Sequence, residues 1–502
     1  MPEATNLVDL KIGLGDALAN AGRPAEAARE FLDAAKMSAA GRALELQQRA
    51  GAQLLMGGHI EEGLEVFRVV LEAVGFKLAK GPKQALLSLI LRRLWIRLRG
   101  FEFTERDASS IPESDLIRID ICRSVAAGLG VVDLIRGADF QSRHLLLALR
   151  AGEIYRVARA MTFEVGQIAA RGGPAEFRAR EMADRVDTLA QRSGNPHAIG
   201  LAIWARGLSA YLLGYWKEAV GFLERAVEIL RDQCTGVTWE LNIAHRFMLS
   251  ALMFLGEMAE VSRRVPQLLS VALEQGNLFA ATDLRTRMNP VWLAADDPDR
   301  ARDEVILALS NWPREGFHLQ HYAAMVALTQ IELYTGDTEV AWRHLEGQVK
   351  PLVKSMLMRF QGLRIEATHV RARLALASAI GSNRERRLKT AENLAQKLVA
   401  ERMAWSDPLA ALIRAGVACS RGDERATAEM ASLAIEGFEV TDMKLYAAAA
   451  RRQLGMIIGG RRGAELIDMS EDWMRRQQIK NPTAFANMLA PGFTEPFQNR
   501  ER

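Results

Sequence analysis

A run of basic residues with one carboxylate stands out in this chain as a candidate binding site. Arg143 and Arg150 lie seven residues apart on one expected helix, and three more charged residues follow at helical spacing. Guanidinium groups form paired hydrogen bonds with carboxylates and phosphates, so such a row suits an acidic peptide or a phosphate. The alternative is a solvated or ion-paired face between stacked helices. The candidate partner-binding residues are Arg136, Arg143, His144, Arg150, Glu153, Arg156 and Arg159.

The sequence contains none of the common catalytic motifs. Its nearest approach to a phosphate-binding loop, Gly75 to Lys83, has the wrong glycine spacing and has Pro82 where the lysine belongs. No kinase catalytic loop is present. His318 and His321 could share a helix face, but two histidines without a third ligand make a poor metal site. We therefore expect a chain that is not an enzyme and that holds no cofactor and no metal.

The charge and cysteine content narrow the function classes further. The net charge is +4 over 502 residues and is spread along the chain, whereas a nucleic-acid binder concentrates its basic residues on one face. The three cysteines, Cys122, Cys234 and Cys419, fit neither a disulfide framework nor a zinc site. The N-terminus lacks the pattern of a secretion signal, and no apolar stretch approaches the roughly 20 residues that span a bilayer. We expect a cytoplasmic protein that does not bind nucleic acid.

The same spacing of small and large residues occurs three times, and it indicates paired helices. In each copy two glycines are followed by a small, a large and a second small residue at fixed offsets. The second glycine suits a left-handed turn between helices, and the small residues let the two helices touch. Such a pair cannot bury its apolar face alone and must stack on neighbours. The signature residues are Gly15, Gly22, Ala27, Phe31 and Ala34; Gly51, Gly58, Gly63 and Phe67; and Gly207, Gly214, Ala219 and Ala226.

This spacing predicts an all-α fold that is similar to the tetratricopeptide repeat. The expected architecture is an α-solenoid, in which antiparallel helix pairs coil into a right-handed superhelix with a long concave groove. One segment does not follow the spacing. The expected parts are N-terminal repeats over 1–75, an irregular long-helix segment over 76–192, central repeats over 193–380, C-terminal helical repeats over 381–490 and a frayed tail over 491–502.

One helix in the irregular segment combines apolar and basic residues. Lys83 to Arg99 places leucines and isoleucines on a broad apolar face, with four arginines around it. A basic amphipathic helix of this kind can lie on a membrane surface. It can also be a long helix inserted into the array, with its arginines solvated or paired. The second arrangement is the commoner one, and we expect it here.

Several strings resemble the C-terminal region of large bacterial signalling proteins. In that family a serine/threonine kinase domain is followed by an AAA-type, STAND-like ATPase and then by a helical array. The kinase and ATPase segments are missing here, so the resemblance carries over no catalytic residue. It implies a C-terminal piece of a longer protein, a separately encoded partner or a product of a shifted start. The strings are VAAGLGVVDLIRGADFQSRHLLLALRAGE, YLLGYWKEAV, WELNIAH, WPREGFHLQHY, LYTGDTEVAWRHL and WMRRQQIKNPTAFANMLAPGF.

The repeats and the resemblance together indicate a function in binding. We expect a non-catalytic helical-repeat scaffold or sensor that mediates protein–protein interaction in bacterial signal transduction. Its partner would be a protein or peptide, and a kinase or an AAA ATPase would fit. The alternative is a small-molecule-sensing module of a STAND-type regulator. The oligomeric state and the identity of the partner stay open.

Overall fold

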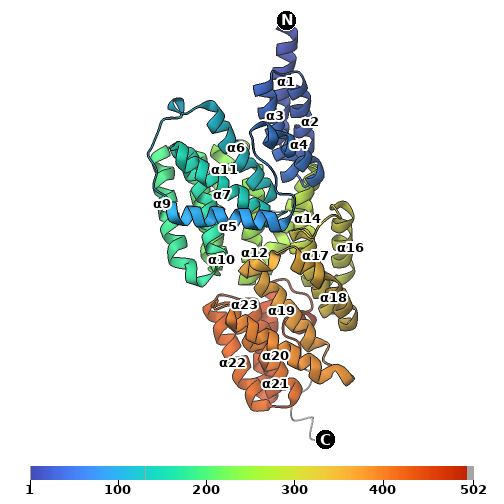
Figure 1. The fold of residues 1–502 in the computed structure, drawn as a ribbon. Helices are drawn as coiled ribbons and strands as arrows, with labels where there is room; N and C mark the ends of the chain where they lie inside the picture. Colours follow the sequence, from blue (N-terminus) through green and yellow to red (C-terminus); the bar gives the residue numbers. More distant parts are fainter. Residues whose placement is uncertain (1, 131, 494–502) are drawn as a thin grey trace.

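The chain folds as an all-α solenoid of helices joined by short turns (Figure 1). The computed structural model describes residues 2–130 and 132–493, and no strand occurs within these ranges. Four short 3-10 helices, η1 (Ala108–Ser110), η2 (Gly173–Ala175), η3 (Leu357–Arg359) and η4 (Gly381–Asn383), lie in the connections. The α-helices are α1 (Pro2–Asn20), α2 (Pro24–Lys36), α3 (Ala40–Met56), α4 (Ile60–Ala73), α5 (Pro82–Arg99), α6 (Glu113–Leu129), α7 (Leu134–Ala151), α8 (Ile154–Ala169), α9 (Glu176–Ser193), α10 (Pro196–Leu213), α11 (Trp216–Gln233), α12 (Thr238–Leu255), α13 (Met258–Glu274), α14 (Leu278–Arg287), α15 (Pro290–Ala294), α16 (Pro298–Asn311), α17 (Leu319–Thr335), α18 (Thr338–Lys354), α19 (Gln361–Ala377), α20 (Arg384–Ala400), α21 (Ser406–Arg421), α22 (Glu424–Val440), α23 (Lys444–Ile458), α24 (Gly460–Arg476) and α25 (Pro482–Leu489).

The three copies of the spacing make the same contact between paired helices. A methyl group added to Gly15 would lie 2.5 Å from the Phe31 ring, which is sixteen residues further on. The equivalent distances are 3.1 Å from Gly51 to Phe67 and 2.6 Å from Gly207 to Leu223. Ala27, Ala34, Ala219 and Ala226 are fully buried. The small residues are therefore the points where the two helices of each pair touch, as the sequence predicted.

The second glycine of each copy forms the turn between the helices. Gly22, Gly58 and Gly214 have φ angles of 75°, 91° and 89°, in the left-handed region that glycine adopts without strain. Later helices end in the same way. Glycines with φ angles between 83° and 89° follow the ends of α12, α17 and α21 at Gly256, Gly336 and Gly422.

Gly207 provides a direct test of the helix contact. We expect Gly207→Ala to lower the free energy of unfolding by about 1–3 kcal/mol, because the new methyl group meets both the side chain and the backbone nitrogen of Leu223. Gly221 on the partner helix α11 is the matched control. Nothing lies within 4 Å of its added methyl group, so Gly221→Ala should raise stability by about 0.5–1 kcal/mol. Urea denaturation measures both changes, and equal effects would contradict the contact.

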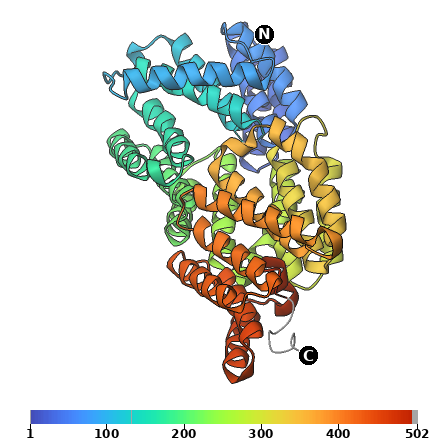
Figure 2. The same ribbon diagram turned by 60° about the horizontal axis from the view of Figure 1, so that its bottom comes forward.

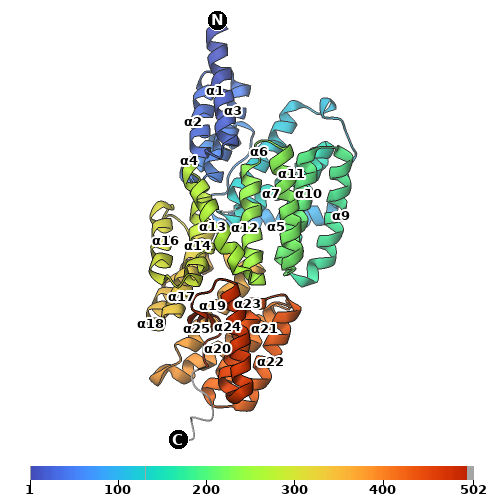
Figure 3. The same cartoon turned by 180° about the vertical axis from the view of Figure 1, so that it is seen from behind.

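The solenoid coils so tightly that parts of the chain 115 to 230 residues apart touch. The Asn20 side chain accepts a hydrogen bond from the Gly236 N–H, and the Gln477 side chain accepts one from the Ala259 N–H. These partners are 216 and 218 residues apart. The Asn481 side chain donates to Asp296, 185 residues away. Figure 3 shows α12 between the N-terminal helices α1–α4 and the C-terminal helices α20–α24.

Two hydrophobic clusters hold the coil together. The larger contains buried residues from Ala52 to Phe493, and the smaller contains residues from Val8 to Leu54 in α1, α2 and α3. Phe493, which falls within the expected frayed tail, is buried. The other expected tail residues, 494–502, lie outside the described part of the chain.

Candidate functional site

The expected row of charged residues lies on two helices and not on one. Helix α7 ends at Gly152, whose φ of 81° turns the chain, and α8 starts directly after Glu153. The helical spacing from Arg143 to Arg159 is therefore interrupted, because Gly152 and Glu153 do not continue the helix. Arg143 and Arg150 remain on α7, whereas Arg156 and Arg159 follow on α8.

Two of the candidate residues, Arg156 and Arg159, meet at Asp120 on α6, and a third, Glu153, pairs with Arg156. Glu153 caps α8 by accepting hydrogen bonds from the backbone N–H groups of Tyr155 and Arg156, at 2.8 and 2.9 Å. Arg156 donates to Asp120 at 2.7 Å, and Arg159 also donates to Asp120. Burial raises the pKa of Asp120, but the two arginines outweigh burial and hold this pKa below its usual value. This cluster is an ion-paired contact between α6 and α8.

The same cluster forms one wall of a polar groove with a volume of about 590 Å³. Helix α3 supplies the opposite wall. Arg42 and Arg49 on α3 pair with Asp9 and Asp16 of α1. The Nε atoms of Arg123 and Arg159 are buried without a hydrogen-bond partner. The charged lining residues are five arginines and three acids: Arg42, Arg49, Arg123, Arg156, Arg159, Glu45, Glu113 and Asp120.

The remaining candidate residues lie elsewhere. Arg136 pairs with Asp133 at 3.4 Å, and the Arg143 guanidinium packs 4.5 Å from the centre of the Phe76 ring. His144 is fully buried beside Gln141, and burial holds its pKa well below the usual value. Arg150 is exposed. The structure therefore brings Glu153, Arg156 and Arg159 together, places His144 near enough for Arg159 to lower its pKa, and separates the other three.

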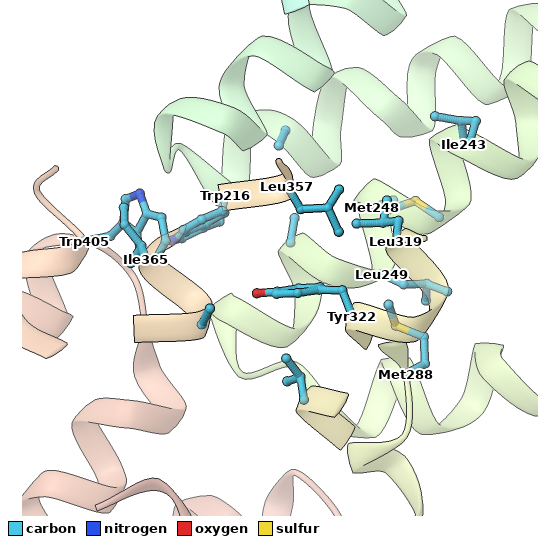
Figure 4. Packing of buried hydrophobic residues seen from close by; sticks show 14 of the residues in the cluster. Trp216, Ile243, Met248, Leu249, Met288, Leu319, Tyr322, Leu357, Ile365 and Trp405 are labelled. Carbon is cyan, nitrogen blue, oxygen red and sulfur yellow. The ribbon is translucent and has the colours of Figure 1, made fainter. Parts of the chain in front are cut away.

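A second site, which the sequence did not indicate, is an aromatic cavity of about 270 Å³ inside the coil. Its walls come from helices α6, α7, α8, α10, α11, α12, α14, α17 and α19 and from the residues that precede α19 and α21. Trp216 stacks on Phe254, with ring centres 4.2 Å apart. Trp216 also meets the edge of Trp405 at 5.6 Å, and Figure 4 shows these two tryptophans close together. The aromatic lining residues are Phe163, Trp204, Tyr211, Trp216, Trp239, Phe247, Phe254, Phe360 and Trp405.

Charged side chains stand at one side of this cavity. Arg246 lies 3.3 Å from Asp283, and Arg287 lies 3.6 Å from Glu366. The Tyr322 hydroxyl donates to Glu366 at 2.8 Å. Burial lowers the pKa of Arg287, but Glu366 and other neighbours outweigh burial and leave this pKa raised. Arg246, Arg287 and Glu366 line the cavity, so its described walls carry two positive charges and one negative charge.

The cavity walls also contain hydrogen-bond donors without partners. The indole N–H groups of Trp204, Trp216, Trp239 and Trp405 are buried and unbonded, as is Nε of Arg287. Among the described lining residues, every buried side-chain nitrogen or oxygen without a partner is one of these donors. A buried donor without an acceptor costs free energy, on the order of 1–3 kcal/mol. Each of these five atoms exposes less than 1 Å² of surface, so an acceptor in the cavity can reach them only after a side chain turns.

The sequence contains one signal that relates to this cavity. Tryptophans recur at helix positions along the chain, and packing between repeats explains much of their burial. Spacing alone does not show that Trp204 and Trp405, two hundred residues apart, line the same space. His318 and His321 do lie together, with ring centres 5.3 Å apart. Within the described residues, no group of three or more metal-ligating side chains is found.

The fold and the two sites define this chain as an all-α helical-repeat protein. No protein-family model matches the sequence, and no curated protein matches it. A solved structure described as a circular tandem repeat protein with novel repeat topology and enhanced subunit contact surfaces is similar at 14% identity. The match covers 94% of this chain and 97% of that one, with a TM-score of 0.14. In the described part of the chain, no helix has both the length and the apolar character needed to cross a membrane.

Proposed function

We propose that this chain is a non-catalytic sensor module that binds a small aromatic ligand in the aromatic cavity. The observation that carries the proposal is a cavity of about 270 Å³ whose wall contains nine aromatic side chains. Ligand pockets are mostly apolar and use a few polar groups to orient what they bind. The nine aromatic side chains favour a ring compound. The guanidinium groups of Arg246 and Arg287 favour a carboxylate on that ring, which would share them with Asp283 and Glu366.

The position of the cavity supports a role in sensing. Its walls join α6–α12 to α17 and α19, which are far apart in sequence. A ligand that contacts all of these helices stabilises the arrangement in which they meet, and thereby shifts the chain toward that arrangement. The resemblance to kinase–ATPase signalling proteins favours a protein partner that responds to this change. The proposed setting is bacterial signal transduction, with a kinase or an AAA ATPase as partner.

The polar groove between α3, α6 and α8 is the surface we propose for such a partner. Five arginines line it, and the carboxylates of an acidic peptide would compete for them with their present partners, which include Asp9, Asp16 and Asp120. Binding of a glutamate-rich peptide, measured by fluorescence anisotropy, tests this part of the proposal. An affinity unchanged by Arg42→Glu would contradict it.

Ligand binding is tested with small aromatic carboxylates and their neutral amides as a matched set. We expect a carboxylate that fits to raise the free energy of unfolding by about 2.7 kcal/mol at a hundred times its Kd, and its amide to have a smaller effect. Leu208→Trp should abolish this increase, because Leu208 lines the cavity and a larger side chain fills it. Leu433→Trp, at an exposed position on α22, is the control. Stabilisation that survives Leu208→Trp would place the ligand elsewhere, and no stabilisation by any carboxylate would contradict the proposal.

A further inference from the structure

Helix α5 is amphipathic, and its apolar side faces outward. Leu87, Ile90, Leu91, Leu94, Trp95 and Leu98 have exposed fractions between 52% and 72%. Only part of the expected apolar face packs inward, through residues such as Ala85 and Ile96. The helix runs across the front of the molecule in Figure 1 and along its outer edge in Figure 2. It therefore presents a nearly continuous apolar strip to the surroundings.

The polar side of α5 is attached to the rest of the molecule. Arg93 forms a bidentate ion pair with Glu164 of α8, whose side chain is 1% exposed. Arg92 pairs with the buried Asp139 of α7, and Arg99 donates to the Leu149 carbonyl oxygen at 3.3 Å. Rolling the helix to bury its leucines would break two buried ion pairs. The outward orientation of the apolar strip is thus fixed by the arginines.

The shape of the strip argues against a coiled-coil partner. Leu87, Leu91, Leu94 and Leu98 follow a four–three–four spacing, which by itself suits a two-helix seam. Ile90 and Trp95 flank them and widen the exposed apolar arc to about 140° at 100° per residue. A seam between two helices is narrower than this. A broad arc with a tryptophan at its margin fits a flat apolar boundary, such as the interface of a lipid bilayer.

The charges around the strip all have one sign. From Phe76 to Phe101 the chain contains seven basic residues and no acidic residue. Lys77, Lys80, Lys83 and Arg97 are exposed. The next two acids, Glu102 and Glu105, already pair with Arg185 and Arg192 of α9. A surface that contacts the apolar strip of α5 also contacts these cations. The protein should therefore bind an anionic surface more tightly than a neutral one.

We propose that α5 docks this protein on an anionic membrane surface. The exposed side chains of α5 enter the headgroup region, and Lys77, Lys80, Lys83 and Arg97 contact the lipid phosphates. The helix lies in the plane of the bilayer and does not cross it, in keeping with its five charged residues. Because the docking surface is separate from the aromatic cavity and the arginine groove, this proposal does not depend on the proposed function.

Vesicle sedimentation with the full chain tests the proposal. We expect binding to vesicles of phosphatidylcholine mixed with phosphatidylglycerol, and at least about tenfold weaker binding to phosphatidylcholine alone. Raising the salt from about 0.05 M to about 0.5 M should weaken the binding, since it shortens the range of the attraction. The double variant Leu91→Gln with Leu94→Gln should lose binding by about tenfold or more, as two apolar side chains leave the interface.

Matched variants separate the docking surface from general effects on the fold. Lys77→Glu with Lys80→Glu should lose about tenfold or more in affinity for the anionic vesicles. Lys389→Glu with Lys397→Glu changes the same charge at exposed positions on α20 and should have little effect. Equal binding to both vesicle types, or binding unchanged by the α5 variants, would overturn the proposal. Self-association that is lost in the leucine variant, without vesicle binding, would replace the membrane with a second copy of the chain.

Discussion

Replacing Arg93 with alanine is expected to lower the free energy of unfolding by about 3–5 kcal/mol. The substitution leaves Glu164 without its bidentate partner, and the Glu164 side chain is 1% exposed. The carboxylate must then stay charged in a dry site or take up a proton, and both alternatives cost free energy. Burial lowers the pKa of Arg93, but the bonds to Glu164 outweigh burial and raise it, in line with a strong pair. Urea denaturation measures the loss.

A double variant distinguishes the buried charge from a general loss of packing. Arg93→Met combined with Glu164→Met removes both charges and keeps apolar volume on both helices. We expect it to recover most of the stability that Arg93→Ala loses, since well-packed apolar residues often replace a buried pair at little cost. If the double variant is as unstable as the single one, the buried charge is not the cause. A loss below about 1 kcal/mol for Arg93→Ala would show that the pair is in effect solvated.

The second large effect is a loss of stability in mild acid. Burial lowers the pKa of six histidines, and the fully buried His144 and His369 lie well below the usual value of 6.5. Positive neighbours, Arg159 for His144 and Arg373 for His369, lower these values further. The folded protein therefore keeps these rings neutral. The unfolded chain takes up protons as the pH falls through 6.5, whereas the folded chain does not, so stability is full above this pH and is lost below it. The other four histidines are His245, His318, His321 and His344.

The expected loss of stability follows from the one proton that each of these histidines takes up in the unfolded chain and not in the folded one. Between pH 7 and pH 5 each ring that stays neutral in the fold lowers the free energy of unfolding by about 2 kcal/mol. His144 and His369 together therefore account for about 4 kcal/mol. Urea denaturation at the two pH values measures it. In His369→Gln the difference between the two values should shrink by about 2 kcal/mol, whatever the substitution costs in packing. A difference equal to that of the unaltered chain would mean that His369 is charged in the fold or does not contribute.

The local architecture could be predicted from the sequence because its causes are local. The contacts of Gly15 with Phe31 and of Gly207 with Leu223 follow from a fixed spacing on two joined helices. The left-handed turns at Gly22 and Gly214 follow from the same pattern. The spacing does not depend on where the pair lies in the molecule, so three copies form the same structure.

The candidate sites could not be predicted in the same way, because they depend on long-range packing. The periodicity of α5 separates leucines from arginines, but it does not show which side faces the molecule. Glu164 and Asp139 decide that, from other helices. The charged row was expected to continue from α7 into α8, and the turn at Gly152 divides it. The aromatic cavity requires Trp204 and Trp405 to meet, and no local pattern relates them.

The contacts between segments that are distant in sequence have a mechanical consequence. A solenoid whose successive turns do not touch can lengthen without losing any contact between turns, because each repeat contacts only its neighbours. Here the turns are joined by contacts such as Asn20 with Gly236 and Gln477 with Ala259. A force that pulls the turns apart must break these contacts before the coil can lengthen. We therefore expect this coil to resist extension until the contacts between its turns break. Once they have broken, it should lengthen abruptly.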